Sequence, residues 1–381
     1  MPTKSLDQIL NNLAVGQTPT TLEWQQLVTQ ALESSQWANA FGITPANAEE
    51  AIQRRVHLFQ AVYSDVLSHP AFHSASQKVS REDGELGSER EENAQSPVLS
   101  PKSRILTSLW KVWLPLALQM VAFRQQLGRP FIQGILGGQG TGKTTLAAVL
   151  SLIFTHLGYR CLSLSLDDLY KTYAERQSLQ EQDSRLIWRG PPGTHDVELG
   201  LQLLDQLRSP HPTEPILVPR FDKSAWQGAG DRTTAEQVEN VDIVLFEGWF
   251  VGVRPINPNR FDAQTPAPIE TPADQAFARD MNKRPKEYLP LWERLDQLML
   301  LYPSDYRLSQ QWRRQAEQQM KASGKSGMSD AQVDRFVEYF WKSLHPELFI
   351  TPLTRYPSYV DLVVEINCDR TIAQIYRPSD A

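Results

Sequence analysis

The chain has 381 residues and a formal net charge of −6 at pH 7. This length allows one large α/β domain with additions, or two domains, and it suffices to bury a core. The acidic balance argues against a general nucleic-acid binder, which usually presents a basic face. Two cysteines are too few for a disulfide framework. Because no apolar run approaches about twenty residues, we expect a cytoplasmic protein that binds neither nucleic acid nor membrane.

The first 72 residues are predicted to form a helical region. Apolar side chains recur at three- and four-residue spacing in Thr21–Ser34 and Ala46–Leu67. Residues 73–102 are rich in Ser, Glu, Asp and Gly, and such a stretch cannot bury enough apolar area to offset its ordering entropy. We expect an acidic, flexible linker or loop there, as a solvated connection rather than a regulatory segment. Residues 103–381 would form the main domain, which opens with an apolar helix at Ile105–Gln126.

A glycine-rich motif at residues 137–144, GGQGTGKT, matches the pattern G-x-x-x-x-G-K-[ST] of phosphate-binding loops. It lies between Ile132–Leu136, expected to be a buried strand, and Thr145–His156, expected to be a helix. The glycines allow backbone N–H groups to converge on an oxyanion, Lys143 would reach the β- and γ-phosphates, and Thr144 would bind Mg²⁺. The residues predicted to contact the nucleotide are Gly137, Gly138, Gln139, Gly140, Thr141, Gly142, Lys143, Thr144 and Thr145. The alternative is a glycine-rich connector without a ligand.

Two further apolar runs end in carboxylates. Cys161–Leu166 precedes Asp167 and Asp168, and Val241–Phe246 precedes Glu247. Residues at the carboxyl ends of parallel strands face the crevice where open α/β sheets bind ligands. We predict Asp167 as the base that accepts the proton of an attacking hydroxyl, with Asp168 in reserve, and we place Glu247 and Asp168 near Mg²⁺. Either aspartate could instead cap the next helix.

Two loops between these strands carry polar side chains. Residues 188–196 (WRGPPGTHD) combine turn residues with charged ones, and residues 218–224 with 231–232 add cations and hydroxyls. Such loops suit a small anionic or hydroxylated ligand. The predicted substrate-side residues are Arg189, His195, Arg220, Lys223 and Arg232. His195 and Asp196 could instead cap the helix that opens near Val197.

The C-terminal part supplies two more strands and a helical segment. Gln297–Tyr302 and Leu362–Asn367 bring the expected sheet to five strands, mainly parallel and flanked by helices. Leu308–Met320 is a polar helix containing Arg313, and an arginine on a closing lid can stabilise the charge of phosphoryl transfer. We predict a helical lid at about residues 303–345 with Arg313 as its catalytic arginine. The alternative is an ordinary charged surface helix.

Five separated motifs occur in a fixed order: GGQGTGKTT, SLDDLY, GPPGTHD, PRFDKS and IVLFEGW. Together they resemble D-glycerate 3-kinase of the plant and cyanobacterial type, in the group of P-loop kinases with phosphoribulokinase, uridine kinase and pantothenate kinase. The match covers about Leu106 to the C-terminus. The resemblance implies an α/β P-loop kinase core, preceded by the helical extension and carrying the lid.

The same resemblance implies that ATP and Mg²⁺ are used to phosphorylate the small molecule D-glycerate at its 3-hydroxyl, as in photorespiratory carbon recovery. Asp167 and Tyr170 fall on the D-x-[FL]-Y motif of the group, whose aspartate is thought to activate the substrate hydroxyl. Two alternatives stay open. One is a related kinase for a nucleoside, pantothenate or a sugar phosphate, and the other is a nucleotide-hydrolysing switch protein. Pro285 stands where the guanine-reading motif N-K-x-D needs Asp, which disfavours GTP.

Overall fold

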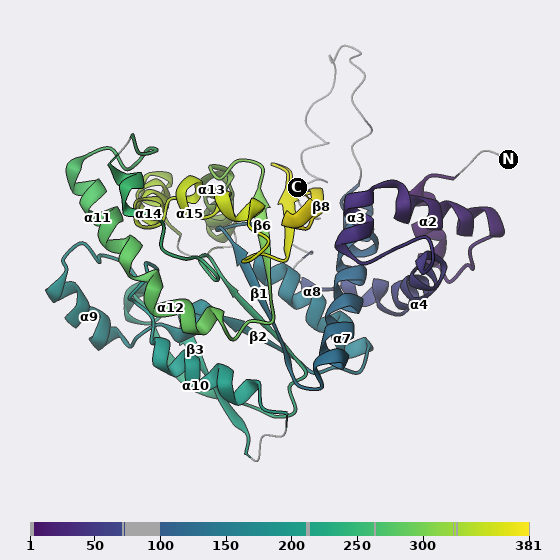
Figure 1. The fold of residues 1–381 in the computed structure, drawn as a ribbon, viewed down its shortest axis with the longest axis horizontal. Coiled ribbons are helices and arrows are strands. Elements are labelled where there is room, and N and C mark those ends of the chain that lie inside the picture. Colours follow the sequence, from purple (N-terminus) through teal and green to yellow (C-terminus); the bar gives the residue numbers. More distant parts are fainter. Residues whose placement is uncertain are drawn as a thin grey trace, which may run out of the picture. The chain divides into compact units, whose positions relative to one another are not determined.

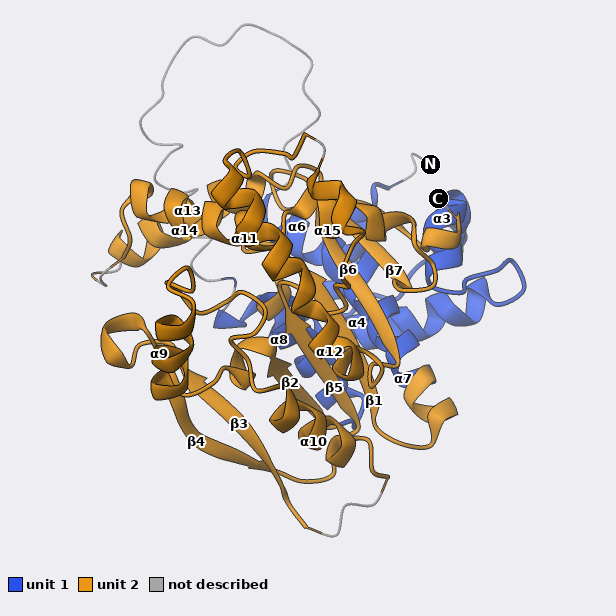
Figure 2. Cartoon of the chain, turned by 60° about the vertical axis from the view of Figure 1, so that its left-hand side comes forward, with its two compact units in different colours: residues 1–122, 145–159 blue, residues 123–144, 160–381 orange. Residues whose placement is uncertain are grey.

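The computed structural model describes residues 4–70, 72, 100–210, 214–262, 264–322, 324 and 327–380. Residues 73–99 of the expected acidic linker lie outside the described residues. The chain divides into two compact units, residues 1–122 with 145–159 (unit 1) and residues 123–144 with 160–381 (unit 2), as Figure 2 shows. The division expected from the sequence, at residues 72 and 102, stays a prediction.

Unit 1 is built from helices. Its elements are α1 (Leu6–Ala14), α2 (Thr21–Glu33), α3 (Ser35–Ala40), α4 (Ala48–Leu67), α6 (Pro101–Ser108), most of α7 (Leu114–Leu127) and most of α8 (Lys143–His156). The helices begin at local signals: Ser5 and Thr20 each cap a helix whose third residue, Gln8 or Glu23, bonds back to the cap. Helices therefore occupy both ranges that showed helical spacing in the sequence.

A single apolar helical run covers Pro101–Leu127, with a π-helical turn at Leu109–Trp113 between α6 and α7. The expectation that no apolar run approaches twenty residues is wrong here, because this helix is long and apolar enough to cross a membrane by length and composition. Within the structure, however, 56% of its most apolar window is buried, as in the core helix of a soluble protein.

Unit 2 contains a six-stranded sheet in the order β2-β5-β1-β6-β7-β8. The strands are β1 (Phe131–Gly137), β2 (Cys161–Ser165), β5 (Ile243–Gly248), β6 (Gln297–Pro303), β7 (Leu362–Ile366) and β8 (Ile372–Tyr376). The first five in this order are parallel, which confirms the five expected strands, and β8 pairs antiparallel with β7 at the edge. The edge strand was missed because its short segment, IAQIY, is only partly buried.

One face of this sheet packs against α10 (Val197–Leu207) and α12 (Pro285–Trp292), as both ribbon views show (Figures 1 and 2). Leu203 and Leu291 from these helices share a core with Val244 and Leu300 of the sheet. The remaining helices are α9 (Tyr173–Gln182), α11 (Pro272–Lys283), α13 (Leu308–Ala322), α14 (Asp330–Ser343) and α15 (Pro346–Phe349). The helix expected at Leu308–Met320 is α13.

A separate antiparallel hairpin, β3 (Ile216–Asp222) with β4 (Asp231–Val238), was not foreseen. Its pairing shifts register between Val218 and Arg220, around Pro219, which has no N–H to donate to a ladder. The turn of this hairpin, residues 223–230, contains a left-handed stretch at Trp226, Gln227 and Gly228. The hairpin brings Arg220, Lys223 and Arg232 to one region of unit 2.

Candidate active site

The phosphate-binding motif follows the central strand, as expected. Gly137 ends β1, and α8 begins at Lys143. The Lys143 ammonium donates to the carbonyl oxygens of Gly137 and Gly138 at 2.8 and 3.0 Å, so the side chain bends back over the loop. Burial lowers the pKa of Lys143, and the carboxylates of Glu247 and Asp167 oppose that shift. The lysine is thus placed between the loop and two acidic side chains.

A pair of oxygen donors lies beside this lysine. The Thr144 hydroxyl oxygen is 3.4 Å from Glu247 Oε1, and Lys143 Nζ is 4.0 Å from Glu247 Oε2. The pair forms because β1 and β5 are adjacent strands, with Ile135 opposite Glu247. Burial raises the pKa of Glu247, while Lys143 counteracts the rise. A hydroxyl and a carboxylate at this spacing fit two ligands of Mg²⁺.

No group of three or more His, Cys, Asp or Glu side chains that could hold a metal ion occurs among the residues that the structure describes. Thr144 and Glu247 would supply two oxygen ligands, and Mg²⁺ in phosphate sites usually binds one or two protein groups and keeps several waters.

Asp167 and Asp168 lie in a 3₁₀ turn, Leu166–Leu169, directly after β2. Asp167 forms an ion pair of 2.6 Å with Lys223 and accepts a hydrogen bond from Tyr170. Burial raises the pKa of Asp167, but Lys223 and the hydrogen bonds outweigh burial, and the net pKa lies below its usual value. Asp167 is therefore an ionised carboxylate close to Lys143.

Asp168 is occupied by structural contacts. Its Oδ2 accepts from the backbone N–H of Ser165 at 2.9 Å and from Arg220 at 2.9 Å. The first contact makes Asp168 a cap of the 3₁₀ turn, which is close to the alternative considered for it. Arg220 also pairs with Glu236 at 2.6 Å. The geometry therefore favours Asp167 over Asp168 as the base, since one carboxylate oxygen of Asp168 is already engaged by two donors. The predicted metal role of Asp168 stays a prediction.

His195 is buried behind Tyr170. The two rings stack with centroids 4.4 Å apart, and His195 Nδ1 lies 2.9 Å from the Tyr288 hydroxyl. Burial lowers the pKa of His195 to about 3, so the imidazole is neutral, and its Nδ1 shares a hydrogen bond with the Tyr288 hydroxyl. Its Nε2 has no hydrogen-bond partner among the described residues. Asp196, in contrast, caps α10 by accepting from Leu199 N, as its alternative held, and also pairs with Arg232 at 2.8 Å.

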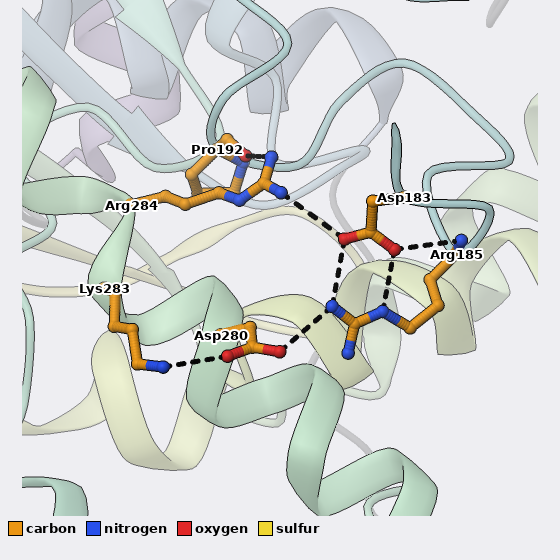
Figure 3. Close-up of polar contacts among 6 residues, drawn as sticks. All are labelled: Asp183, Arg185, Pro192, Asp280, Lys283 and Arg284. Carbon is orange, nitrogen blue, oxygen red and sulfur yellow. Dashed lines mark hydrogen bonds and ion pairs between the residues drawn. The ribbon is translucent and has the colours of Figure 1, made fainter. Parts of the chain in front are cut away.

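Arg284 connects the loop that carries His195, residues 190–196, to a network of ion pairs (Figure 3). Arg284 donates to the Pro192 carbonyl and pairs with Asp183, which in turn pairs with Arg185. Gly193 has a φ of +95°, and a Cβ there would lie 2.4 Å from the Arg284 guanidinium. Glycine is therefore required for the loop and Arg284 to approach this closely.

The expected lid helix α13 is anchored at the phosphate loop. A Cβ on Gly140 would lie 2.5 Å from Trp312 Cβ, and the Trp312 indole, which is 1% exposed, donates to the Cys368 carbonyl. Arg313 is paired with the buried Glu317 at 2.6 Å within the same helix. A role for Arg313 in transfer requires it to leave Glu317, and that role stays a prediction.

Three neighbours of the candidate site were missed from the sequence: Arg176, which donates to the carbonyls of Lys171, Ala229 and Gly230, and the residues Tyr288 and Trp312. Arg176 and Tyr288 are placed by contacts between distant segments, which no local pattern encodes. Trp312 did carry a signal, since it is a large apolar residue within an otherwise polar helix.

No protein-family model matches the sequence. An uncharacterized kinase of Schizosaccharomyces pombe is 32% identical over 221 residues, which cover 56% of this chain and 79% of that protein. The chloroplastic D-glycerate 3-kinase of Arabidopsis thaliana is 31% identical over 237 residues, 58% of this chain and 49% of that enzyme. The solved structure of D-glycerate 3-kinase from Cryptococcus neoformans var. grubii is 27% identical, with a TM-score of 0.58, and the match covers 69% of this chain and 99% of that one.

A phosphate loop after the central parallel strand, with carboxylates at the ends of the two strands on one side of it, defines an ATP-dependent P-loop kinase that acts on small molecules. Within that class, the chain belongs to the same kinase family as the Schizosaccharomyces pombe protein, and it is similar to the two proteins named D-glycerate 3-kinase.

Proposed function

We propose that the protein transfers the γ-phosphoryl group of ATP to the 3-hydroxyl of D-glycerate, giving 3-phosphoglycerate and ADP. The observation that carries this proposal is one cluster in which the loop lysine, Lys143, lies within electrostatic reach of both Glu247 and Asp167. The relatives named D-glycerate 3-kinase support the acceptor. The cytoplasmic location and the role in photorespiratory carbon recovery belong to the same proposal.

Each side chain of the cluster has a distinct task. Lys143 leaves the loop carbonyls to bind the β- and γ-phosphates, and Asp167 accepts the proton of the acceptor hydroxyl as its oxygen bonds to phosphorus. The bond from the γ-phosphorus to its bridging oxygen breaks, and that oxygen departs with ADP. Tyr170 keeps the Asp167 carboxylate oriented through its hydrogen bond. Thr144 and Glu247 would hold Mg²⁺, which neutralises charge on the transferred group.

The direct test is to incubate the pure protein with Mg·ATP and a panel of acceptors, and to identify the product by mass spectrometry. The panel contains D-glycerate, L-glycerate, uridine, pantothenate and ribulose 5-phosphate. We expect 3-phosphoglycerate from D-glycerate at the highest kcat/KM. Preferred phosphorylation of another acceptor would move the protein to a related kinase activity, and ATP hydrolysis that is indifferent to every acceptor would favour the switch protein.

The matched control is Lys143→Ala. Because the ammonium group of this largely buried side chain contacts loop carbonyls and Glu247 rather than apolar core, the variant should fold like the wild type and transfer no phosphoryl group. Turnover close to that of the wild type would show that the loop does not bind the reacting phosphates.

A further inference from the structure

Most arginines near the candidate site are already neutralised by a carboxylate. The pairs are Arg220 with Asp168 and Glu236, Arg232 with Asp196, Arg284 with Asp183, and Arg185 with Asp183 and Asp280. A guanidinium that is paired in this way has less charge to offer to a ligand.

Arg176 and Arg189 differ from these arginines. Arg176 donates only to backbone carbonyls, those of Lys171, Ala229 and Gly230, and Arg189 donates to the carbonyl of Gly228. Within the described parts of the chain, neither guanidinium forms an ion pair with a carboxylate within 4.0 Å. Neither charge is therefore neutralised by a direct carboxylate partner, and each guanidinium keeps N–H groups beyond those that bond to the carbonyls.

The carboxylate that most stabilises the charge of Arg176 is Asp231, and it is engaged elsewhere. Its Oδ1 accepts from the backbone N–H groups of Tyr173 and Arg232, and its Oδ2 accepts from the Trp226 indole. The positive charge of Arg176 is thus only partly offset.

The two free guanidinium groups lie over one aromatic ring. The central carbons of Arg176 and Arg189 are 5.2 and 5.6 Å from the ring centroid of Phe221. The pKa of Arg176 is lowered by burial and further by the charge of Arg189, so the two cations repel each other. An anion bound to both would remove this repulsion.

Arg176 and Arg189 also line a cavity of about 430 Å³, whose other walls include Leu186, Trp188 and Trp226. This volume is ample for a small organic acid. The Phe221 ring meets Tyr170, with centroids 5.0 Å apart, and the Tyr170 hydroxyl bonds to Asp167. Burial raises the pKa of Tyr170, and the positive charge of Arg189 is close enough to the Tyr170 hydroxyl to counteract that rise. The two cations are therefore connected to the proposed base through Phe221 and Tyr170.

We propose that Arg176 and Arg189 together bind the carboxylate of a small hydroxy acid and so determine acceptor specificity. This inference rests on the proposed function, since an acceptor held there presents its distal hydroxyl toward Asp167. It assigns a role to Arg176, which no sequence pattern indicated. It also selects Arg189 as the carboxylate ligand in preference to Arg220 and Arg232, whose charges are already paired. An uncharged acceptor such as a nucleoside has no group that neutralises the two cations.

The experiment compares Arg176→Gln, Arg189→Gln and the double variant with the wild type in steady-state kinetics. A charge-assisted bond of this kind is worth about tenfold or more in affinity. We expect each single variant to raise KM for D-glycerate about tenfold, the double variant more, and KM for ATP to stay the same. Arg189→Gln is the cleaner variant, because Arg176 also binds three carbonyls near the hairpin.

The matched control is Arg294→Gln, which removes an arginine that is already paired with Asp205 and does not line the cavity. It should change KM for D-glycerate by less than about twofold, since a paired, partly exposed charge contributes little. If the wild type phosphorylates D-glycerate and both test variants keep its KM, the arginine assignment is wrong while the proposed function stands.

A binding measurement decides the case in which the wild type does not phosphorylate D-glycerate. Calorimetric titration with D-glycerate and, separately, with inorganic phosphate reports on the cations without any turnover. Binding of D-glycerate that both variants weaken supports the carboxylate site and contradicts only the proposed reaction. Three results would overturn the inference: D-glycerate binding that neither variant weakens, phosphate binding that both variants weaken more than they weaken D-glycerate binding, and binding of neither ligand.

Discussion

Asp167 and Asp168 are neighbours in sequence with different surroundings. Asp167 contacts two side chains, the exposed Lys223 and the buried hydroxyl of Tyr170, whereas Asp168 is bound to the backbone of Ser165 and to Arg220. We expect Asp167→Asn to lower kcat by about 10²-fold or more while ATP still binds. Steady-state kinetics and a nucleotide-binding titration measure the two effects.

The control for this prediction is Asp168→Asn. Since Asp168 caps the 3₁₀ turn, we expect it to lower the free energy of unfolding by about 1 kcal/mol and to affect kcat less. The reverse pattern, with the large loss of kcat in Asp168→Asn, would assign the base to Asp168.

His195 makes stability depend on pH. Its pKa is about 3 in the folded protein and about 6.5 in the unfolded chain, so between these values only the unfolded chain binds the proton. Stability therefore falls as pH falls below 6.5. His345, whose burial lowers its pKa to about 4, acts in the same direction. From pH 7.5 to 5.0 we expect each histidine to reduce the free energy of unfolding by about 2 kcal/mol.

Urea unfolding at pH 7.5 and 5.0 checks this expectation. His195→Asn, which can still accept from Tyr288, should lose about 2 kcal/mol less over the interval than the wild type. Equal losses in both proteins would mean that His195 is already protonated in the folded state.

At the residue scale, local motifs predicted the positions of Lys143, Thr144, Glu247 and Asp167. They did so because a phosphate loop and the ends of parallel strands converge on one edge of a sheet. The sequence could not show which substrate-side arginine is available to bind a ligand, because the carboxylates that pair with these arginines come from distant segments. Asp168 pairs with Arg220, and Asp196 with Arg232. Which arginine is left without a carboxylate depends on the whole arrangement.

At the element scale, α13 and the phosphate loop constrain each other. Gly140 and Gly142 both have positive φ, +78° and +87°, so alanine at either position costs about 1–2 kcal/mol in backbone strain. Only at Gly140 does the new Cβ also meet Trp312; nothing lies within 4 Å at Gly142. We expect Gly140→Ala to destabilise the protein by about 1–3 kcal/mol more than Gly142→Ala.

Thermal unfolding of the two alanine variants measures this difference. Gly140→Ala should also weaken ATP binding more, because displacement of α13 distorts the loop. Equal stability of the variants would show that α13 moves away from Gly140 at little cost, as a loosely held lid would.

The elements themselves were predictable where the sequence pattern is local. The five parallel strands are continuous apolar runs, and α13 shows helical spacing. The β3–β4 hairpin was missed because its first strand is interrupted by Pro219 and its second, DRTTAEQV, is mostly exposed and polar. Without a buried face, a strand shows no apolar period to detect.

At the scale of the whole molecule, each unit consists of two separated stretches of chain. Residues 123–144, with β1 and the phosphate loop, are inserted between the stretches of unit 1, and residues 145–159 of unit 1 separate the stretches of unit 2. Neither unit can therefore be produced by a simple truncation. We expect one cooperative unfolding transition, with equal calorimetric and van 't Hoff enthalpies.

Differential scanning calorimetry of the full chain tests this expectation. The same scan with Mg·ATP at a hundred times its Kd should show the wild type stabilised by about 2.7 kcal/mol and Lys143→Ala unchanged. Two resolved transitions, of which nucleotide shifts only one, would show that the units unfold independently.

The ion pair between Lys223 and Asp167 has a consequence for the rate at which ATP is hydrolysed when no acceptor is bound. A carboxylate whose negative charge is already matched by an ammonium group is a poor acceptor for a proton from a passing water molecule. We expect an acceptor alcohol to displace the lysine, and only then is the carboxylate free to react. Lys223 alone would thus keep the rate of ATP hydrolysis by water low, even before the site closes.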